Sequence, residues 1–252
     1  MLNIFISGIL FLLGICIGSF LNVVSDRLPR GLTLGGRSRC DHCKKILGIL
    51  DLVPVISYLL LSGKCRYCKR KIAWQYTAVE IVTGITFVIL YIFFPLNLSF
   101  FFRLILYSCL IAIFLADIKF RIIPDQLVIL MGIAAIMLRF WDVTFGWEAI
   151  LSGLALSFIF LILYLLTSGR GMGMGDVKFA FVMGLMLGFP VVIVGFYVAF
   201  LTGALVSIIL ILGGKKRFGQ TIAFGPFLVL ATVISDIFGD RLWELFQKMV
   251  LP

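Results

Sequence analysis

Residues 3–24 read NIFISGILFLLGICIGSFLNVV, a run of 22 residues without a charged side chain. About 20 consecutive apolar residues are enough to cross the hydrocarbon core of a bilayer as an α-helix. A cleaved signal peptide would carry a basic residue before the apolar run and a small-residue cleavage site after it, and neither is present here. The run therefore predicts a membrane helix that is not removed.

The rest of the chain repeats this pattern. Of the 252 residues, 62% are hydrophobic and only 13% are charged, which is far more apolar than a soluble domain of this length requires. Together with the first run, we identify eight candidate membrane helices: Asn3–Val24, Trp74–Phe94, Leu98–Ala116, Pro124–Phe140, Trp147–Leu166, Val177–Phe189, Pro190–Leu212 and Thr221–Phe238. We predict an all-α polytopic membrane protein with about eight transmembrane helices.

The net charge of +10 is distributed unevenly. Eleven of the 22 Lys and Arg residues lie between Arg27 and Lys71. If successive helices alternate sides, 18 basic residues lie on one side and four on the other, namely Arg103, Arg139, Arg241 and Lys248. The positive-inside rule makes the crowded side cytoplasmic, with both termini on the opposite side. The basic excess thus reflects topology and attraction to anionic lipid, not nucleic-acid binding, which would need a folded basic surface with stacking aromatics.

Residues 25–73 form the only long hydrophilic stretch, and it contains two CxxC pairs. The pairs are Cys40 with Cys43 and Cys65 with Cys68. Four thiolates complete the tetrahedron of a structural zinc site, which leaves no open coordination position for catalysis. Disulfides are the alternative, but a reducing cytosol disfavours them. We expect a small zinc-knuckle cytoplasmic domain between the first two helices.

This expectation divides the chain into a first transmembrane helix (1–24), a cytoplasmic zinc-binding domain (25–73) and a second transmembrane domain (74–252). His42, the only histidine, lies inside the first knuckle and is an alternative metal ligand. Cys16 and Cys109 lie alone within predicted helices, where a buried and unreactive thiol is the expectation.

Few of the 12 acidic residues fall where hydrocarbon is expected. Five lie near outer helix ends or in the tail, where we expect solvated or capping groups: Asp142, Glu148, Asp236, Asp240 and Glu244. Three belong to the hydrophilic loop: Asp26, Asp41 and Asp51. The remaining four are Glu80, Asp117, Asp125 and Asp176. Asp125 follows Pro124 at a helix start and is interpreted as a helix cap.

Asp117 ends one predicted helix and Asp176 begins another, both at the cytoplasmic boundary. Taken alone, each position has a structural explanation. Asp117 would pair with Lys119 or Arg121, whose long side chains reach toward water, and Asp176 would be stabilised by the dipole at the helix N-terminus. Together they indicate aspartic-protease chemistry, in which two carboxyls share one proton near neutrality, because both cannot ionise cheaply. The helix N-terminus favours the ionised role for Asp176. A serine triad is improbable, because the chain has no GxSxG motif and its lone histidine lies in a knuckle.

Residues 171–179, GMGMGDVKF, lead into the helix that begins near Val177. With about 13 residues this helix is roughly 20 Å long, against about 30 Å of hydrocarbon. We therefore expect the glycine-rich loop, including Gly173 and Gly175, to dip into the membrane and bring Asp176 to a substrate. The alternative is that small residues simply allow close helix packing.

Six motifs, in this order, resemble the type IV prepilin peptidases. They are GSFLNVVSDRLP (18–29), the paired CxxC knuckles, LVPVISYLLLSGKCRYC (52–68), QYTAVE (75–80), ADIKFRIIPDQL (116–127) and GMGDVK (173–178). The resemblance implies a GxGD-type intramembrane aspartic protease whose catalytic pair falls on Asp117 and Asp176. Such enzymes cut prepilins or pseudopilins of pilus, type II secretion and competence systems after the glycine that ends a basic leader. They then methylate the new amino terminus, commonly phenylalanine, with S-adenosylmethionine.

The resemblance also assigns two supporting residues. Glu80 matches a family glutamate that would bind the new amine or take part in methyl transfer, although Thr77 stands where the family has proline. A buried partner for a loop Arg or Lys is the alternative for Glu80. Lys178 matches the motif and would orient a carboxylate or mark topology. No glycine signature for S-adenosylmethionine is visible, so the methyl-donor site cannot be placed from the sequence.

Two other functions are compatible with the composition alone. An ion-coupled transporter would use the carboxylates as a relay, but it should show repeated halves, and the knuckle pair and the glycine loop each occur once. A zinc-stapled scaffold for pilus or secretion assembly would need neither aspartate.

Overall fold

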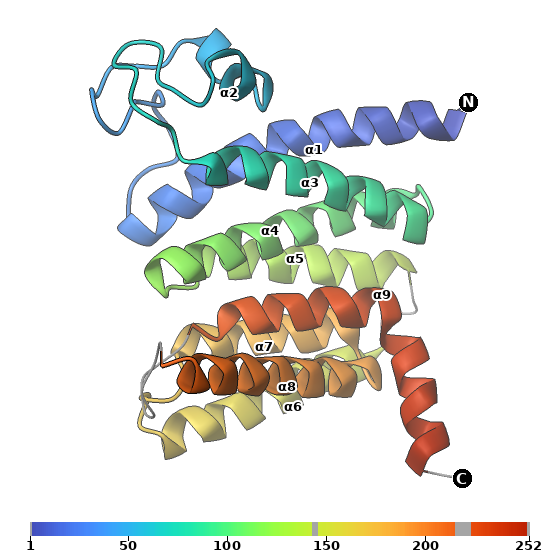
Figure 1. Cartoon of the computed structure of the whole chain (residues 1–252). Helices are drawn as coiled ribbons and strands as arrows, with labels where there is room; N and C mark the ends of the chain where they lie inside the picture. Colours follow the sequence, from blue (N-terminus) through green and yellow to red (C-terminus); the bar gives the residue numbers. More distant parts are fainter. Residues whose placement is uncertain (1, 143–145, 215–222, 251–252) are drawn as a thin grey trace. The chain divides into compact units, whose positions relative to one another are not determined.

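The computed structural model describes residues 2–142, 146–214 and 223–250, and these are helical throughout apart from their loops (Figure 1). The long helices are α1 (Leu2–Arg27), α3 (Trp74–Phe93), α4 (Leu98–Phe120), α5 (Asp125–Asp142), α6 (Trp147–Leu166), α7 (Met174–Leu187), α8 (Val191–Leu212) and α9 (Gly225–Val250). Three short elements precede α3: η1 (Leu28–Arg30), η2 (Ile49–Asp51) and α2 (Ile56–Leu60). The predicted all-α class is confirmed.

A helix forms at each of the eight expected spans. Among the described residues, five helical segments are long and apolar enough to cross a membrane: Leu2–Arg30, Trp74–Phe93, Leu98–Phe120, Trp147–Leu166 and Val191–Leu212. This supports a multi-pass membrane protein, whereas the count of eight spans is not confirmed. The basic run Lys215–Arg217 and the expected start of the last span at Thr221 lie outside the described residues.

The chain forms two compact units, Met1–Phe100 and Phe101–Pro252. In the first unit α1 packs along α3. Gly14 and Gly84 face each other so closely that a Cβ on Gly14 would lie 2.7 Å from the Cα of Gly84. Small residues let two helix backbones approach in this way within a membrane. Near the C-terminal end of α1, the Asn22 side-chain amide donates to the Tyr76 carbonyl (3.0 Å) and the Tyr76 hydroxyl donates to Asp26 (3.2 Å).

In the second unit α7 is the central helix and packs against α5, α6, α8 and α9. Ten of its 14 residues are buried, including residues on every side of the helix. A helix that is apolar all round is expected to be enclosed by protein. The spans α6 and α8, in contrast, keep most of their surface outward.

A buried ion pair links α4 to α9 within the second unit. Arg103 Nη1 donates to both carboxylate oxygens of Asp236 at 2.8 Å, and the Tyr107 hydroxyl donates to Asp236 Oδ2 at 2.9 Å. The Asp236 side chain is only 8% exposed. The expectation that Asp236 is solvated or caps a helix end was wrong, because its partners lie 129 and 133 residues earlier in the chain.

Candidate active site and metal centre

The two CxxC pairs adopt the same local structure. In the first, the Cys40 N–H donates to the Lys45 carbonyl and the Lys44 N–H donates to the Cys40 carbonyl; Cys65, Arg70 and Lys69 repeat both bonds in the second. The residue after each second cysteine, Lys44 or Lys69, has a left-handed backbone, with φ of 59° and 58°. Each turn is closed by an isolated antiparallel bridge, 39 to 46 and 64 to 71. The chain thus presents two equivalent pairs of thiols.

The knuckles bring all four sulfurs together. The Sγ atoms of Cys40, Cys43, Cys65 and Cys68 lie within 4.8 Å of one another, and those of Cys40 and Cys68 are 3.8 Å apart. Tetrahedral zinc with Zn–S bonds of about 2.3 Å separates its sulfurs by about 3.8 Å, so the donor set fits one such ion. His42 is exposed, and its Nδ1 lies 3.2 Å from Arg70 Nη1 instead of joining the sulfurs.

The thiols differ in acidity. Donation from the Cys43 backbone lowers the pKa of the Cys40 thiol to about 7. At Cys68, donation from the Arg70 backbone lowers the pKa, but loss of hydration and the three neighbouring cysteines outweigh it and raise the pKa to about 11. Four negative charges therefore need a cation to coexist here. Outside this cluster Cys109 is buried as expected, whereas Cys16 is exposed on α1, contrary to expectation.

Asp117 lies in the last turn of α4 and is buried, with 5% of its surface exposed. The α4 helix ends at Phe120, and the next residue, Arg121, has a left-handed backbone (φ 55°) and donates its N–H to the Asp117 carbonyl at 2.9 Å. The Asp117 side chain accepts a hydrogen bond from the Gly225 N–H, at the start of α9, with a length of 2.9 Å. A Cβ on Gly225 would lie 2.6 Å from that same carboxylate oxygen. Only glycine fits this position without moving Asp117.

Asp176 lies in the first turn of α7 and is also buried, at 7% exposure. Its Oδ2 reaches back to accept a hydrogen bond of 2.9 Å from the N–H of Gly173, the residue that precedes the helix. Asp176 is therefore placed at a helix N-terminus, where unsatisfied N–H groups favour an anion. Asp117 meets the equivalent end of α9, so the helix-terminus argument no longer favours Asp176 alone as the ionised member.

Gly175 brings the α4–α5 connection against the start of α7. A Cβ on Gly175 would lie 3.0 Å from the Cβ of Ile123, four residues before Leu127 of α5 and six after Asp117. This close approach brings the α4–α5 connection, six residues after Asp117, against the first turn of α7, which holds Asp176. Asp117 and Asp176 are thus two buried carboxyls, and each accepts a hydrogen bond from a backbone N–H. Two such groups can supply the general acid and the general base that the attack of water on a peptide bond requires.

Lys178, one turn of helix later, pairs with Asp125. Its ammonium lies 2.8 Å and 2.9 Å from the two carboxylate oxygens, and both side chains are about half exposed. Asp125 is the first residue of α5, so the pair links α5 to α7 beside the buried aspartates. Exposed pairs of this kind contribute at most about 1 kcal/mol of stability.

Glu80 lies in the first unit, on α3, and is buried at 7% exposure. Its Oε2 accepts a hydrogen bond of 2.8 Å from the N–H of Val55. Gly18 of α1 packs directly on it, since a Cβ there would lie 2.7 Å from the Glu80 Cα. No loop Arg or Lys is among these partners. Val55 itself has a positive φ of 61°, which a β-branched residue rarely adopts.

Two family models match the chain. The bacterial peptidase A24 N-terminal domain matches residues 12–94, and the type IV leader peptidase family matches residues 104–208. The prepilin leader peptidase/N-methyltransferase of Bacillus subtilis (strain 168) is 31% identical over 97% of this chain and 99% of its own. Proteins of the same name from Stutzerimonas stutzeri and Pseudomonas aeruginosa are 27% and 29% identical, over 91% and 94% of this chain and 90% and 92% of theirs. No solved structure matches.

Proposed function

The chain belongs to the type IV leader peptidase family, and from this premise we propose that it removes the leader of prepilins or pseudopilins and N-methylates the new amino terminus. The observation that carries the peptidase assignment is the pair Asp117 and Asp176, two buried carboxyls that each accept a hydrogen bond from a backbone N–H. Both lie inside the residues that match the family model. We assign them as the catalytic aspartates, supported by Gly173, the residue before α7, and by Gly175 in the first turn of α7.

The chemistry follows from two carboxyls that share one proton. The ionised member takes a proton from water, which attacks the scissile carbonyl, while the protonated member donates its proton to the carbonyl oxygen. As the peptide bond breaks, the carboxyl that took the proton from water donates it to the leaving amine, while the other carboxylate takes a proton from a hydroxyl of the tetrahedral intermediate. The N–H groups of Gly225 and Gly173 stabilise whichever carboxylate carries the charge, so the two residues can exchange roles during the cycle.

The scissile bond of the substrate is a Gly–Phe type junction, by family resemblance. Cleavage there would free a phenylalanine amino group for methylation, for which S-adenosylmethionine supplies the methyl group when it is bound. A sulfonium donor is positively charged, and the new amine must give up its proton before its nitrogen can accept the methyl group, so a carboxylate nearby would serve both needs. Glu80 is a buried carboxylate of the first unit that suits this need, and we propose that it holds the new amine.

The metal is Zn²⁺ in this proposal, bound by Cys40, Cys43, Cys65 and Cys68. Thiolates are the ligands that zinc prefers in closed four-coordinate sites, and the sulfur spacing supports the assignment. The ion then stabilises residues 25–73, which have few buried apolar side chains of their own. Peptide cleavage does not involve it.

The topology we propose has about eight spans in the bacterial inner membrane, with the zinc-binding domain (25–73) and both aspartates on the cytoplasmic side. The first helix (1–24) precedes this domain, and the transmembrane peptidase domain (74–252) follows it. The unequal division of basic residues supports this orientation.

One assay tests the peptidase assignment. Purified full-length protein is incubated with a prepilin bearing a Gly–Phe junction, and the wild type is compared with Asp117→Asn, Asp176→Asn and Asp125→Asn. Each of the first two substitutions should reduce cleavage at least about 100-fold, because each removes a general acid–base. Asp125→Asn is the matched control and should stay within threefold. Full cleavage by Asp117→Asn or by Asp176→Asn would exclude the assignment. Cleavage by the variant that carries both substitutions would exclude it as well. Methylation of a pre-cleaved peptide by the same variants confirms that they are folded.

A further inference from the structure

Residues 49–62, which we call the bridging segment, join the two knuckles and contain η2 and α2. Their sequence is ILDLVPVISYLLLS. Six large apolar side chains of the segment point outward, with exposures between 40% and 88%: Ile49, Leu50, Leu52, Ile56, Leu59 and Leu60. A water-soluble surface rarely gathers so many within 12 residues, and such a patch normally marks a contact with another molecule or with lipid.

The bridging segment also exposes no charged side chain to its surroundings. Its only charged residue is Asp51, whose side chain is 6% exposed. The two carboxylate oxygens of Asp51 turn back to the Gly48 N–H (3.1 Å) and to Arg66 Nε (2.6 Å). The outward face of the segment therefore exposes no charged side chain and is mainly apolar, although it belongs to the most basic region of the chain.

A hydrogen bond fixes the segment beside a membrane helix. The Val55 N–H donates to Glu80 Oε2 at 2.8 Å, and Glu80 lies six residues after Trp74, the first residue of α3. Six residues of α-helix rise about 9 Å. Trp74 is largely exposed and is a residue type that marks the membrane–water interface. Val55 thus lies at the depth of the second turn of α3, and Figure 1 draws α2 level with part of α1 along the helix axis.

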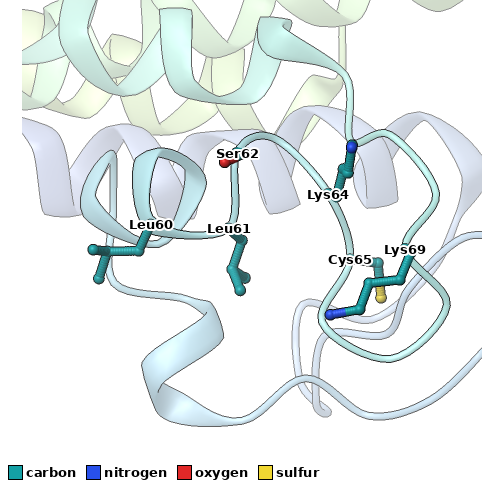
Figure 2. A pocket seen from close by; sticks show the side chains of 6 residues that line it. All are labelled: Leu60, Leu61, Ser62, Lys64, Cys65 and Lys69. Carbon is teal, nitrogen blue, oxygen red and sulfur yellow. The ribbon is translucent and has the colours of Figure 1, made fainter.

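A basic rim borders the apolar face. A cavity of about 260 Å³ is lined by Leu60 and Leu61 at the end of the segment and by Lys64, Cys65 and Lys69 of the second knuckle, with Ser62 between them. Figure 2 shows these side chains around it. Two ammonium groups next to two leucines match a phospholipid, which presents a phosphate beside acyl chains. Lysine side chains close to an anionic membrane surface strengthen binding to it.

We propose that the bridging segment is an interfacial membrane anchor whose occupant is anionic phospholipid. Its six exposed apolar side chains enter the leaflet that holds the C-terminal end of α1 and the N-terminal end of α3, and Lys64 and Lys69 bind the headgroup phosphates. Amphipathic segments with apolar and basic faces bind the boundary between headgroups and acyl chains in this way. The metal-binding module is thereby held flat on the membrane instead of projecting into water.

The test uses full-length, metal-loaded protein in nanodiscs that contain phosphatidylglycerol and a lipid with a nitroxide quencher on its acyl chain. A bimane label is attached at Leu60→Cys in a Cys16→Ser background, with Arg37→Cys as the control position in a polar, exposed part of the same module. We expect at least twofold stronger lipid quenching at position 60 than at position 37. Ile49→Cys should behave like Leu60→Cys and guards against a local effect of one label.

Three results would overturn the proposal. Equal lipid quenching at positions 60 and 37 would place the segment in water. Shielding of position 60 that appears only when a prepilin peptide is added would make the substrate the occupant. Shielding that requires two protein copies in one disc would indicate an interface between chains. Lys64→Glu with Lys69→Glu should weaken the quenching in anionic discs and leave it unchanged in phosphatidylcholine discs; equal loss in both would exclude the headgroup contact.

Discussion

The backbone N–H of Gly225, the first residue of α9, donates a hydrogen bond of 2.9 Å to Oδ2 of Asp117 at the end of α4. The two residues are 108 positions apart, and the bond is buried. α9 is therefore part of the proposed active site through its backbone, although it contributes no catalytic side chain.

Replacing Gly225 by alanine should lower cleavage by about 100-fold, because a Cβ 2.6 Å from Oδ2 must push the Asp117 carboxylate aside. The effect should fall on kcat and leave KM nearly unchanged, since substrate binding does not depend on the N–H. Gly132→Ala is the matched control, because its Cβ would make only an ordinary contact of 3.6 Å with Val182. Steady-state kinetics on a prepilin peptide distinguish the two; an unchanged kcat in Gly225→Ala would show that the bond does not position Asp117.

The buried pair of Arg103 and Asp236 should be a determinant of stability. Asp236→Ala leaves the Arg103 cation uncompensated and should cost about 3–5 kcal/mol of unfolding free energy. The double variant Arg103→Leu/Asp236→Leu removes both charges and should be clearly more stable than Asp236→Ala. Thermal unfolding in detergent measures both. If the single variant melts at the wild-type temperature, the pair is not a structural link between α4 and α9.

Loss of one knuckle thiol should release the metal. Cys40→Ser should lower bound zinc from one ion per chain to well below half, and residues 25–73 should become sensitive to protease, because metal binding and folding are coupled in small modules. We expect methylation to fall more than cleavage. Cys16→Ser is the control, since that thiol is exposed outside the cluster. Metal content by mass spectrometry is the measurement, and equal values for both variants would contradict a four-cysteine site.

The role of Glu80 can be tested with two substitutions that separate its negative charge from its hydrogen bond to Val55. Glu80→Gln keeps an acceptor for the Val55 N–H and loses the negative charge, whereas Glu80→Ala loses both. If the carboxylate holds the new amine, both variants should reduce methylation of a pre-cleaved peptide at least tenfold, while cleavage continues. Normal methylation by Glu80→Gln together with loss in Glu80→Ala would instead show that Glu80 only positions the bridging segment.

The sequence was a good guide wherever the signal was local. The apolar run Trp147–Leu166 predicted α6 with the same bounds, and the spacing of Cys40, Cys43, Cys65 and Cys68 predicted their cluster. Both signals depend on side chains that lie within one element or on a motif with a fixed geometry.

The signal failed where the partner was remote or had no side chain. Asp236 looked like a solvated end group because Arg103 lies 133 residues away. The role of Gly225 could not be predicted, because it acts through its backbone N–H, a group that every residue except proline has. The bridging segment was hidden inside a stretch judged hydrophilic as a whole, since the lysines and arginines around it outweighed its leucines.

The enclosure of α7 by its neighbours has one more consequence. A helix that touches lipid must match the thickness of the bilayer, and it tilts or distorts the membrane when it does not. With ten of its 14 residues buried, α7 is exempt from that constraint. The height of Asp176 is thus fixed by protein packing alone, so membranes of different lipid composition should leave the relative position of the two acids unaltered.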